Sequence, residues 1–349
     1  MQVTAPLSTT VVLVNWNRRE MLTECLRSLI RQTGVLFEVV VVDNGSSDGS
    51  VEMLEGVFVE NLTFALHLIK NTDNKGFCAA NNQGIAAARG EFIALLNNDA
   101  VAAEGWLSAL EQALREYPQA GMAASKILVY ENPTRIDKAG HLIYPDGQNR
   151  GRGSGETDCG QFDRMEEVLW PDGCAAMYRR SMLAEIGGFD EDLFAYGDDA
   201  ELGLRARIAG WTCIYVPDAV VHHRRGATLG LLSSRRLELI ERNRVLLVVK
   251  HFPLRMLFLS APYYALRVAA GIWAALRGKG EVGRFPGVSG KVRVAMALLR
   301  GNWQALRMLP RTWRKRRQMD AIRRLTPAQV RELLLRYRIS LRALMEQAI

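Results

Sequence analysis

The sequence lacks the glycine-rich loops that hold phosphates in many nucleotide-binding folds. Neither GxxxxGK[ST] nor GxGxxG follows the first apolar run. Such loops place phosphates on the N–H groups of a helix N-terminus, so ATP or a dinucleotide bound in that way is not expected.

Cysteines are few, odd in number and without a CxxC pair: Cys25, Cys78, Cys159, Cys174 and Cys213. This pattern predicts reduced thiols in a cytosolic chain, and neither a disulfide framework nor a zinc site.

Acidic side chains are scarce in the last third of the chain. Residues 222–349 contain 27 Lys and Arg against six Asp and Glu, a net charge of +21, whereas residues 1–221 contain 18 against 31, a net charge of −13. The basic third predicts an anionic partner, either membrane phospholipid or nucleic acid. The N-terminal stretch "MQVTAPLSTTVVLVNWN" also lacks the basic region and cleavage site of a signal peptide.

The first hundred residues alternate between apolar runs and segments with helical spacing. Strands are expected at 9–17, 37–43, 64–71 and 91–100, and helices at 19–32, 51–58 and 76–90. The runs of Val, Leu and Ile do not alternate with polar residues, which indicates strands covered on both faces. The sequence therefore predicts an α/β fold with a mostly parallel sheet and crossover helices.

All four predicted strands end in polar residues rich in Asn and Asp, namely "NWN", "DNGSSDGS", "NTDNKGF" and "NNDA". Ligands bind at the carboxyl ends of parallel strands, so these ends predict one site. Asp43 is suited to a ribose hydroxyl or a base N–H. Asp99, beside Asn98, is suited to a divalent cation because carboxylate oxygens are hard ligands. Together they favour a nucleoside diphosphate bound through metal and ribose.

With these motifs the chain resembles the inverting glycosyltransferases of family 2, which have the GT-A fold, and most closely their bacterial rhamnosyltransferase-like members. The matching segments, in family order over about residues 9–228, are "VVLVNWNR", "VVVVDNGSSDGS", "NKGFCAANNQGI", "LLNNDA", "WPDGCAAMYRRSMLAEIGGFDEDLFAYGDDAELGLRARIAGW" and "VPDAVVHH". The resemblance implies a mostly parallel sheet with helices on both faces, and transfer of a sugar from a nucleotide.

The resemblance assigns the donor side of the site. "NND" corresponds to the family's DxD element, so Asp99 would contact a Mg²⁺ or Mn²⁺ ion and Asn98 the ribose. Asn97 replaces the first acid of that element, which predicts modest metal affinity. His223 falls on a position that completes the metal site in some members, whereas its neighbour His222 is expected to be structural or solvated.

The nucleoside side is assigned in the same way. Asp43, Asn15 and Asn17 fall where the family reads the nucleoside. Gly76 would let the ligand approach the backbone closely. Lys75 faces either a phosphate or solvent.

The segment "FDEDLFAYGDDAELGLR" contains six acids, with Asp198 and Asp199 expected in the first turn of a helix. Both could simply cap that helix, where the dipole stabilises negative charge. The resemblance instead implies that Asp199 is the catalytic base and Asp198 the acid preceding it, on the acceptor side. In the segment 168–180, Trp170 would stack on an acceptor sugar, and Gly173 would let substrate approach the backbone.

The basic third is predicted to associate with a membrane. The apolar segment 252–276 contains Arg255, Arg267 and two prolines, so it could lie in the headgroup plane, span the bilayer or be a packed helix. The segment "MLPRTWRKRRQ" (308–318) adds basic residues that anionic lipid would attract. Two domains are expected, a glycosyltransferase domain at 1–228 and a basic helical region at 229–349.

The sequence as a whole predicts a metal-dependent inverting glycosyltransferase at the cytoplasmic face of the membrane. Its expected donor is a nucleotide sugar, with dTDP-rhamnose favoured over a UDP-sugar, and its expected acceptor is a glycan or polyprenyl-linked glycan of cell-surface polysaccharide synthesis. Nucleic acid is not an expected partner. A sugar nucleotidylyltransferase and a non-enzymatic nucleic-acid binder are the alternatives. A sugar nucleotidylyltransferase would need a glycine-rich loop after the first strand, which this sequence lacks. A nucleic-acid binder would leave the acidic sheet edge unexplained.

Overall fold

The structure, a computed structural model, describes residues 7–56, 62–226, 230, 233–277, 285 and 287–346. Its main feature is a ten-stranded mixed sheet with the order β10-β12-β6-β11-β4-β1-β2-β3, in which β5 pairs with β12 and β7 with β6. Strands β1 to β4 run parallel to one another, and β12 runs parallel to β6, whereas β11 is antiparallel to both β4 and β6. The strands are β1 (Thr9–Asn15), β2 (Phe37–Asp43), β3 (Ala65–Lys70), β4 (Phe92–Leu96), β5 (Ala100–Ala102), β6 (Ala120–Val129), β7 (Asn132–Lys138), β8 (His141–Ile143), β9 (Asn149–Gly151), β10 (Glu166–Val168), β11 (Ala175–Arg179) and β12 (Thr212–His223).

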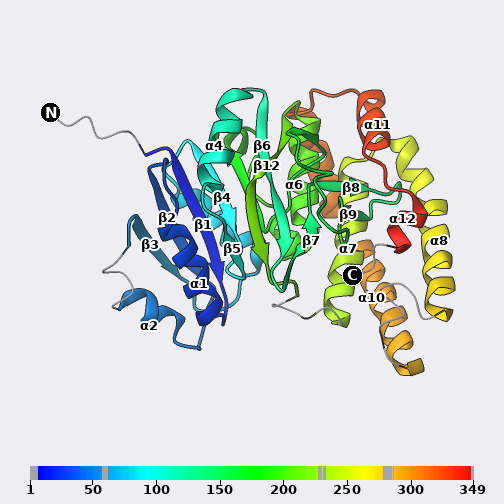
Figure 1. Ribbon diagram of the computed structural model, residues 1–349. Coiled ribbons are helices and arrows are strands. Elements are labelled where there is room, and N and C mark those ends of the chain that lie inside the picture. Colours follow the sequence, from blue (N-terminus) through cyan, green and yellow to red (C-terminus); the bar gives the residue numbers. More distant parts are fainter. Residues whose placement is uncertain are drawn as a thin grey trace.

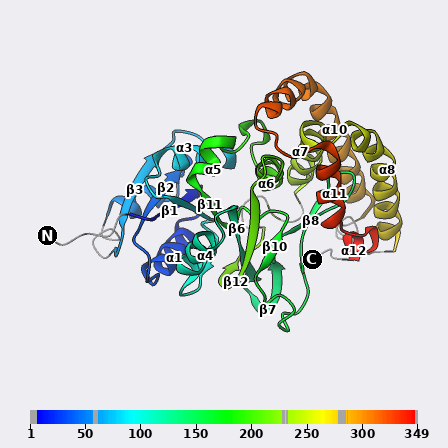
Figure 2. The ribbon, with the colours of Figure 1, turned by 90° about the horizontal axis from the view of Figure 1, so that it is seen from above.

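Helices cover both faces of this sheet. The helices are α1 (Arg19–Ile30), α2 (Ser50–Glu55), α3 (Phe77–Ala87), α4 (Trp106–Glu116), α5 (Arg180–Ile186), η2 (Glu191–Leu193), α6 (Asp198–Ile208), α7 (Ser234–His251), α8 (Leu254–Leu276), α10 (Gly287–Gln318), η3 (Met319–Ala321), α11 (Pro327–Arg336) and α12 (Leu341–Glu346). Figure 2 shows α1 and α4 on one side of the sheet and α3 and α5 on the other. All residues of β2 are buried, as its unbroken apolar run predicted.

Successive residues of one strand serve two cores, because side chains alternate across a sheet. Val11 and Leu13 pack with the helix residues Leu26 and Trp106 in one core, whereas Val12 belongs to the other. The parallel register also aligns the strand ends, with Asn15 opposite Asp43. The polar ends therefore gather at one edge, as predicted.

The helices α7, α8, α10, α11 and α12 form the end of the molecule away from β3 (Figure 1). Buried ion pairs join them to the sheet region. Lys250 Nζ lies 2.6 Å from Glu201 Oε1 and 2.8 Å from Asp190 Oδ2, and His251 Nε2 lies 2.9 Å from Glu201 Oε1. The predicted domain boundary, between residues 228 and 229, lies outside the described residues.

Two cations of the basic segment 308–318 contact the protein itself, which corrects the prediction that this segment as a whole is available to a membrane. Lys315 pairs with Asp190 and with Asp192, and Arg316 donates to the backbone carbonyl of Val249 over 2.7 Å. These two cations therefore hold α10 onto the rest of the molecule, Lys315 through acids of the predicted acid-rich segment and Arg316 through a carbonyl of α7. Arg314 remains exposed.

Exposed apolar side chains gather on α8 and α10. On α10, Val288, Val292, Met296, Leu299, Trp303 and Leu306 are between 44% and 79% exposed, and we call this set the α10 stripe. Its members recur every three or four residues, so they share one side of the helix. On α8, Phe258 is 78% and Trp273 59% exposed. No helix within the described residues is long and apolar enough to cross a bilayer.

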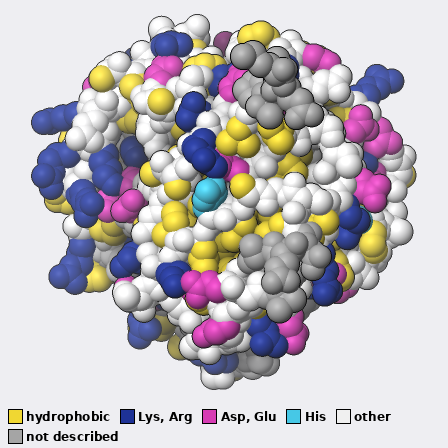
Figure 3. All heavy atoms as spheres, turned by 90° about the vertical axis from the view of Figure 1, so that its left-hand side faces the viewer, with side chains coloured by type: hydrophobic (Ala, Val, Ile, Leu, Met, Phe, Trp, Pro, Cys, Tyr) yellow, Lys and Arg dark blue, Asp and Glu magenta, His cyan; other side chains and the backbone are white. Residues whose placement is uncertain are grey.

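The charge on α10 differs from that on the other end of the molecule. The sequence of α10 contains nine Lys and Arg and no Asp or Glu. The face at the β3 edge, by contrast, carries acidic and basic side chains mixed with hydrophobic ones (Figure 3). The positive charge predicted for the last third is thus concentrated beside an exposed apolar stripe.

Candidate active site

Side-chain hydrogen bonds join the ends of β1, β2 and β4. The Asn15 amide donates to Asp43 Oδ1 over 3.0 Å, and the Asn98 amide donates to Asn15 Oδ1 over 2.8 Å. Asn17, with a left-handed φ of 51°, accepts from the Ser47 N–H over 2.7 Å. Of these residues Asn98 lines the cavity described below, whereas Asn15 and Asp43 are buried and do not. Contact of Asn15, Asn17 and Asp43 with a nucleoside stays a prediction.

Asp99 and His223 are brought together because β12 pairs with β5, which places His223 opposite Ala100. His223 Nε2 lies 3.5 Å from Asp99 Oδ1, and His223 Nδ1 lies 2.8 Å from Asp137 Oδ2. Burial disfavours the charged imidazole, but Cys174, Asp137 and Asp99 raise the pKa of His223 well above its usual range. Asp99 Oδ1 is buried without a hydrogen-bond partner. A carboxylate oxygen beside an imidazole nitrogen suits a divalent cation.

A second charged cluster joins β7, β8 and α6. His141 Nε2 lies 3.0 Å from Asp172 Oδ2 and 3.4 Å from Asp199 Oδ2, and Lys138 Nζ lies 2.5 Å from the same oxygen of Asp172. His141, Asp172 and Asp199 are close enough to hold a metal ion among themselves. However, Lys138 already supplies positive charge to Asp172. Asp99 and His223 offer a second pair of ligand atoms for a metal ion in the same cavity.

Asp198 and Asp199 open α6 directly after Gly197, whose left-handed φ of 74° turns the chain into the helix. Burial and the neighbouring Asp199 charge raise the pKa of Asp198 to about 8. Burial also raises the pKa of Asp199, while the nearby His141 lowers it. Asp198 therefore holds its proton more strongly than an ordinary aspartate, because it is buried beside the negative charge of Asp199.

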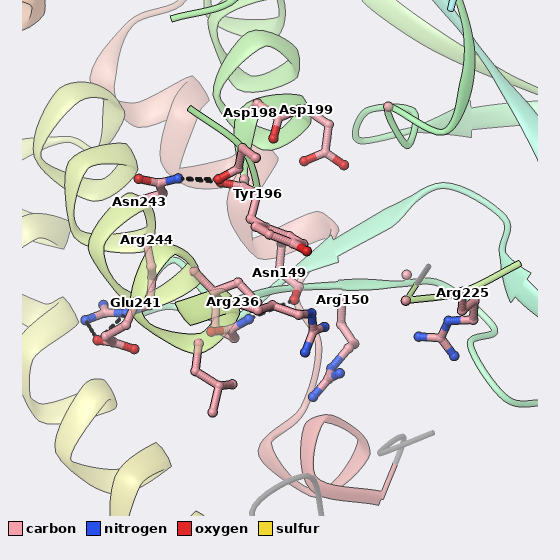
Figure 4. Close-up of a pocket in the computed structure, with 18 of the residues that line it drawn as sticks. Asn149, Arg150, Tyr196, Asp198, Asp199, Arg225, Arg236, Glu241, Asn243 and Arg244 are labelled. Carbon is pink, nitrogen blue, oxygen red and sulfur yellow. Dashed lines mark hydrogen bonds and ion pairs between the residues drawn. The ribbon is translucent and has the colours of Figure 1, made fainter. Parts of the chain in front are cut away.

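Both clusters line one cavity of about 680 Å³. Figure 4 shows Asp198 and Asp199 on one side of it, with Tyr196 next to them and Arg150, Arg225 and Arg236 beyond. Its polar part thus combines a pair suited to a metal ion with a carboxylate that can accept a proton. This combination can activate a hydroxyl next to a bound diphosphate.

The prediction that Trp170 stacks on an acceptor sugar is wrong for this structure. Its side chain is 0% exposed, so it has no surface to offer a ligand. A Cβ added to Gly203 would lie 2.2 Å from the Trp170 Cβ, which shows how closely α6 covers it. The indole stacks on the His141 ring with centroids 6.0 Å apart. Trp170 therefore supports the second cluster from below the surface.

The two predicted glycines line the cavity for different reasons. A Cβ on Gly173 would lie 3.7 Å from Asp198 Oδ2, so the glycine leaves the space beside the two acids open. Gly76 has a left-handed φ of 86°, and a Cβ there would lie 2.4 Å from the Phe194 ring. The Phe194 ring therefore explains the glycine at position 76 without a ligand.

The sequence left open what Lys75 and His222 contact. Lys75 Nζ lies 3.0 Å from Asp73 Oδ1 at the surface. His222 is partly buried, which lowers its pKa, and it does not line the cavity. Neither position brings the side chain to the charged clusters.

Sequence reasoning missed five residues at this site, although two lay inside quoted motifs. Trp16, in "NWN", is 37% exposed and lines the cavity, and Asp172 is the acid of "WPDG". The others come from the stretch between β6 and β10, whose short strands carry little periodic signal: Asp137, Lys138 and His141.

Solved structures share this fold. A mannosyltransferase of Pyrobaculum calidifontis in complex with GDP-Man and Mn²⁺ aligns over 91% of this chain and 86% of its own, with a TM-score of 0.52 and 20% identity. A structure of GalNAc-T7 with UDP, GalNAc and Mn²⁺ aligns over 62% of this chain and 43% of its own, with a TM-score of 0.53 and 18% identity. The chain therefore has the GT-A fold of the nucleotide-sugar glycosyltransferases, as predicted.

Sequence comparison narrows the class. Residues 10–187 match the model of Glycosyl transferase family 2, and the chain belongs to this family. The N-acetylglucosaminyl-diphospho-decaprenol L-rhamnosyltransferase of Mycobacterium tuberculosis is 29% identical over 249 residues, which cover 62% of this chain and 76% of the relative. A pre-mycofactocin glycosyltransferase of the same organism is 29% identical over 188 residues, 53% of this chain and 37% of the relative. The predicted resemblance to rhamnosyltransferase-like members is confirmed.

Proposed function

We propose that this protein is a metal-dependent, inverting glycosyltransferase that moves rhamnose from dTDP-rhamnose to a hydroxyl of a polyprenyl-linked glycan. The observation that carries the proposal is that one cavity is lined by both the Asp99–His223 pair and the Asp199 carboxylate. The relative named as a rhamnosyltransferase acting on a decaprenol-linked sugar supports the choice of donor and acceptor.

In this proposal Asp199 is the general base. Its carboxylate takes the proton of the acceptor hydroxyl while the acceptor oxygen attacks the anomeric carbon of the donor. The bond from that carbon to the diphosphate breaks in the same displacement, so the nucleoside diphosphate leaves and the anomeric configuration inverts. The raised pKa of Asp198 keeps that carboxyl protonated, so it adds no second negative charge beside Asp199. His141 in turn stabilises the ionised form of Asp199.

The donor side is assigned to the strand ends. Asp99 and His223 would hold Mg²⁺ or Mn²⁺, which when bound stabilises the charge that develops on the leaving diphosphate. Asn98 faces the ribose, and Asn15, Asn17 and Asp43 fix the loops that surround the nucleoside. Gly173 and Asp198 lie on the acceptor side, where the open space beside the glycine admits the hydroxyl.

We further propose that the C-terminal helices place the enzyme peripherally on the cytoplasmic face of the membrane. Support comes from the α10 stripe and from the nine basic and no acidic residues of that helix. An exposed apolar face flanked by Arg and Lys favours the interface of an anionic bilayer.

The test is transfer with a panel of nucleotide sugars and N-acetylglucosaminyl-diphospho-decaprenol as acceptor, with Mn²⁺ or with a chelator. We expect nucleoside diphosphate release with dTDP-rhamnose that stops when the metal is removed. Turnover with a UDP-sugar instead would correct the donor and keep the reaction class. The absence of transfer from every donor would overturn the proposal.

A further inference from the structure

The cavity of the active site does not end at the charged clusters but continues between the C-terminal helices. This second part, which we call the helical chamber, lies between α7, α8 and α10. Its wall includes the following apolar side chains: Leu237, Ile240, Val268, Ile272, Val294 and Leu298. Glu241 also lines it, but Arg244 and Arg267 both pair with that carboxylate, at 2.6 Å and 3.1 Å. The chamber therefore offers an apolar ligand a largely uncharged surface.

Positive charge lies where the polar part of the cavity meets the helical chamber. Arg150 comes from β9 and Arg236 from α7, and both line the cavity. The Arg236 guanidinium lies 5.7 Å from the centroid of the Tyr196 ring, and Figure 4 shows Arg150 and Arg236 on the far side of Tyr196 from Asp198 and Asp199. Two guanidinium groups from different elements suit a phosphate or diphosphate, because each can donate two parallel hydrogen bonds.

The helical chamber also reaches the surface between α8 and α10. Ile272, which lines it, is 58% exposed, and Lys291 and Ala295 line it from exposed positions on α10. The neighbouring residues on the surface are apolar, since Trp273 follows Ile272, and Val292 of the α10 stripe follows Lys291. The opening is thus rimmed by the exposed apolar face of the molecule.

We propose that the helical chamber binds the isoprenoid chain of a lipid-linked acceptor and that Arg150 and Arg236 bind its diphosphate. The order of groups in the cavity matches the order of groups in such a molecule: carboxylates for the sugar hydroxyl, guanidinium groups for the diphosphate and apolar walls for the chain. The lipid would enter from the bilayer through the opening between α8 and α10. This inference rests on the proposed function, which supplies the polyprenyl-linked acceptor.

Gly271 gives a sharp test of the chamber. It lines the chamber in the last two turns of α8, and a Cβ there would have no neighbour within 4 Å. Gly271→Phe should therefore fill the chamber without disturbing the helix, since Gly is a poor helix former. The matched control is Ala269→Phe, which adds the same ring at an exposed position on α8 that does not line the cavity.

Each variant is assayed with N-acetylglucosaminyl-diphospho-decaprenol and with the same glycosyl diphosphate carrying a methyl group in place of decaprenol. Gly271→Phe should raise KM for the decaprenyl acceptor at least tenfold and leave KM for the methyl acceptor unchanged. Ala269→Phe should leave both values unchanged. Equal losses on both acceptors, or no loss on either, would overturn the chamber assignment.

The assignment of Arg236 to the acceptor diphosphate is tested separately. Arg236→Gln should raise KM at least tenfold for both acceptors, because both carry the diphosphate, and leave KM for the nucleotide sugar unchanged. Arg235→Gln is the control, since Arg235 is exposed, pairs with Glu238 and does not line the cavity. An Arg236 effect on the nucleotide sugar alone would move these arginines to the donor. Wild-type protein that uses neither acceptor with any donor would contradict the proposed function itself.

Discussion

Asp198 and Asp199 are adjacent in the sequence, but Asp198 is buried whereas Asp199 is partly exposed, and their surroundings differ. His141 lies within 3.4 Å of Asp199, whereas the pKa of Asp198 is raised to about 8 by burial and by the Asp199 charge. At the scale of single residues, the neighbouring imidazole therefore decides which carboxylate can act as a base.

Asp199→Asn should reduce kcat by about 10²–10⁴-fold, the usual contribution of a general base. Nucleotide-sugar affinity should be retained, because the proposed donor contacts lie at the strand ends. Turnover and isothermal calorimetry measure the two effects. Asp198→Asn is the matched control and should lose less, since that carboxyl holds its proton. A variant at position 199 that keeps more than about a tenth of wild-type turnover would remove Asp199 from the base role.

Asp99→Ala should weaken donor binding in the presence of Mn²⁺ and leave metal-free binding nearly unchanged. The reason is that Asp99, whose Oδ1 has no hydrogen-bond partner within the protein, would contact the donor only through the cation. Calorimetric titration of the nucleotide sugar with and without Mn²⁺ is the measurement. Equal affinities for wild type and variant at saturating Mn²⁺ would exclude Asp99 from the metal site.

At the scale of elements, buried ion pairs decide how α7 and α10 sit on the sheet region. Lys250 contacts both Glu201 and Asp190, and Lys315 contacts Asp190 and Asp192. Five of the six acids that the sequence analysis singled out therefore divide into two groups. Asp198 and Asp199 face the cavity, whereas Glu201, Asp190 and Asp192 bind the C-terminal helices. The sixth acid, Glu191, belongs to neither group and accepts a hydrogen bond from the Asn82 amide.

Lys250→Met should lower the free energy of unfolding by about 3 kcal/mol, because it leaves buried carboxylates short of a partner. Urea unfolding followed by circular dichroism measures the change. Lys70→Met is the control, since Lys70 pairs with Glu55 at the surface and its loss should change stability little. Equal midpoints for the Lys250 variant and wild type would show that this ion pair does not hold α7 in place.

At the scale of the whole molecule, the residues proposed for catalysis and those proposed for membrane contact occupy different regions. The charged clusters lie at the carboxyl ends of the strands, and the α10 stripe lies on the C-terminal helices. Peripheral attachment would thus bring the cavity to a lipid-linked substrate without a spanning helix.

Replacing Arg293, Arg300, Arg307 and Arg314 by Gln should weaken binding to anionic vesicles by roughly 4 kcal/mol, at about 1 kcal/mol per basic residue near the surface. The four lie on α10 at seven-residue intervals, are exposed and share one side of the helix. Co-sedimentation with phosphatidylglycerol vesicles measures the effect, and wild-type binding should fall as salt increases. The control carries Gln at four exposed or solvent-facing basic positions of the other end: Arg27, Arg31, Lys70 and Lys75. Salt-resistant binding of the Gln variant at wild-type levels would contradict the proposal.

Much of the fold was determined by the sequence itself. Unbroken apolar runs predicted buried strands, and their polar ends predicted a site at one edge, because local patterning follows directly from which side chains can be buried. The position of Asp199 at a helix start and the helical form of the segment 252–276 were also predicted. Strand and helix formation at these positions depends on residues that lie close together in the sequence.

Only the tertiary structure decided which of these residues meet. His141 and Asp172 are separated by 31 positions and join Asp199 through strand pairing and helix packing, and no local pattern marks such a contact. The aromatic ring of Trp170 suggested a surface on which a sugar could stack, but α6 buries it. Lys315 and Arg316 read as part of one basic cluster with Arg314, yet packing turns the first two inward. Burial and long-range pairing set these outcomes, because they depend on what the folded chain places on the other side of each residue.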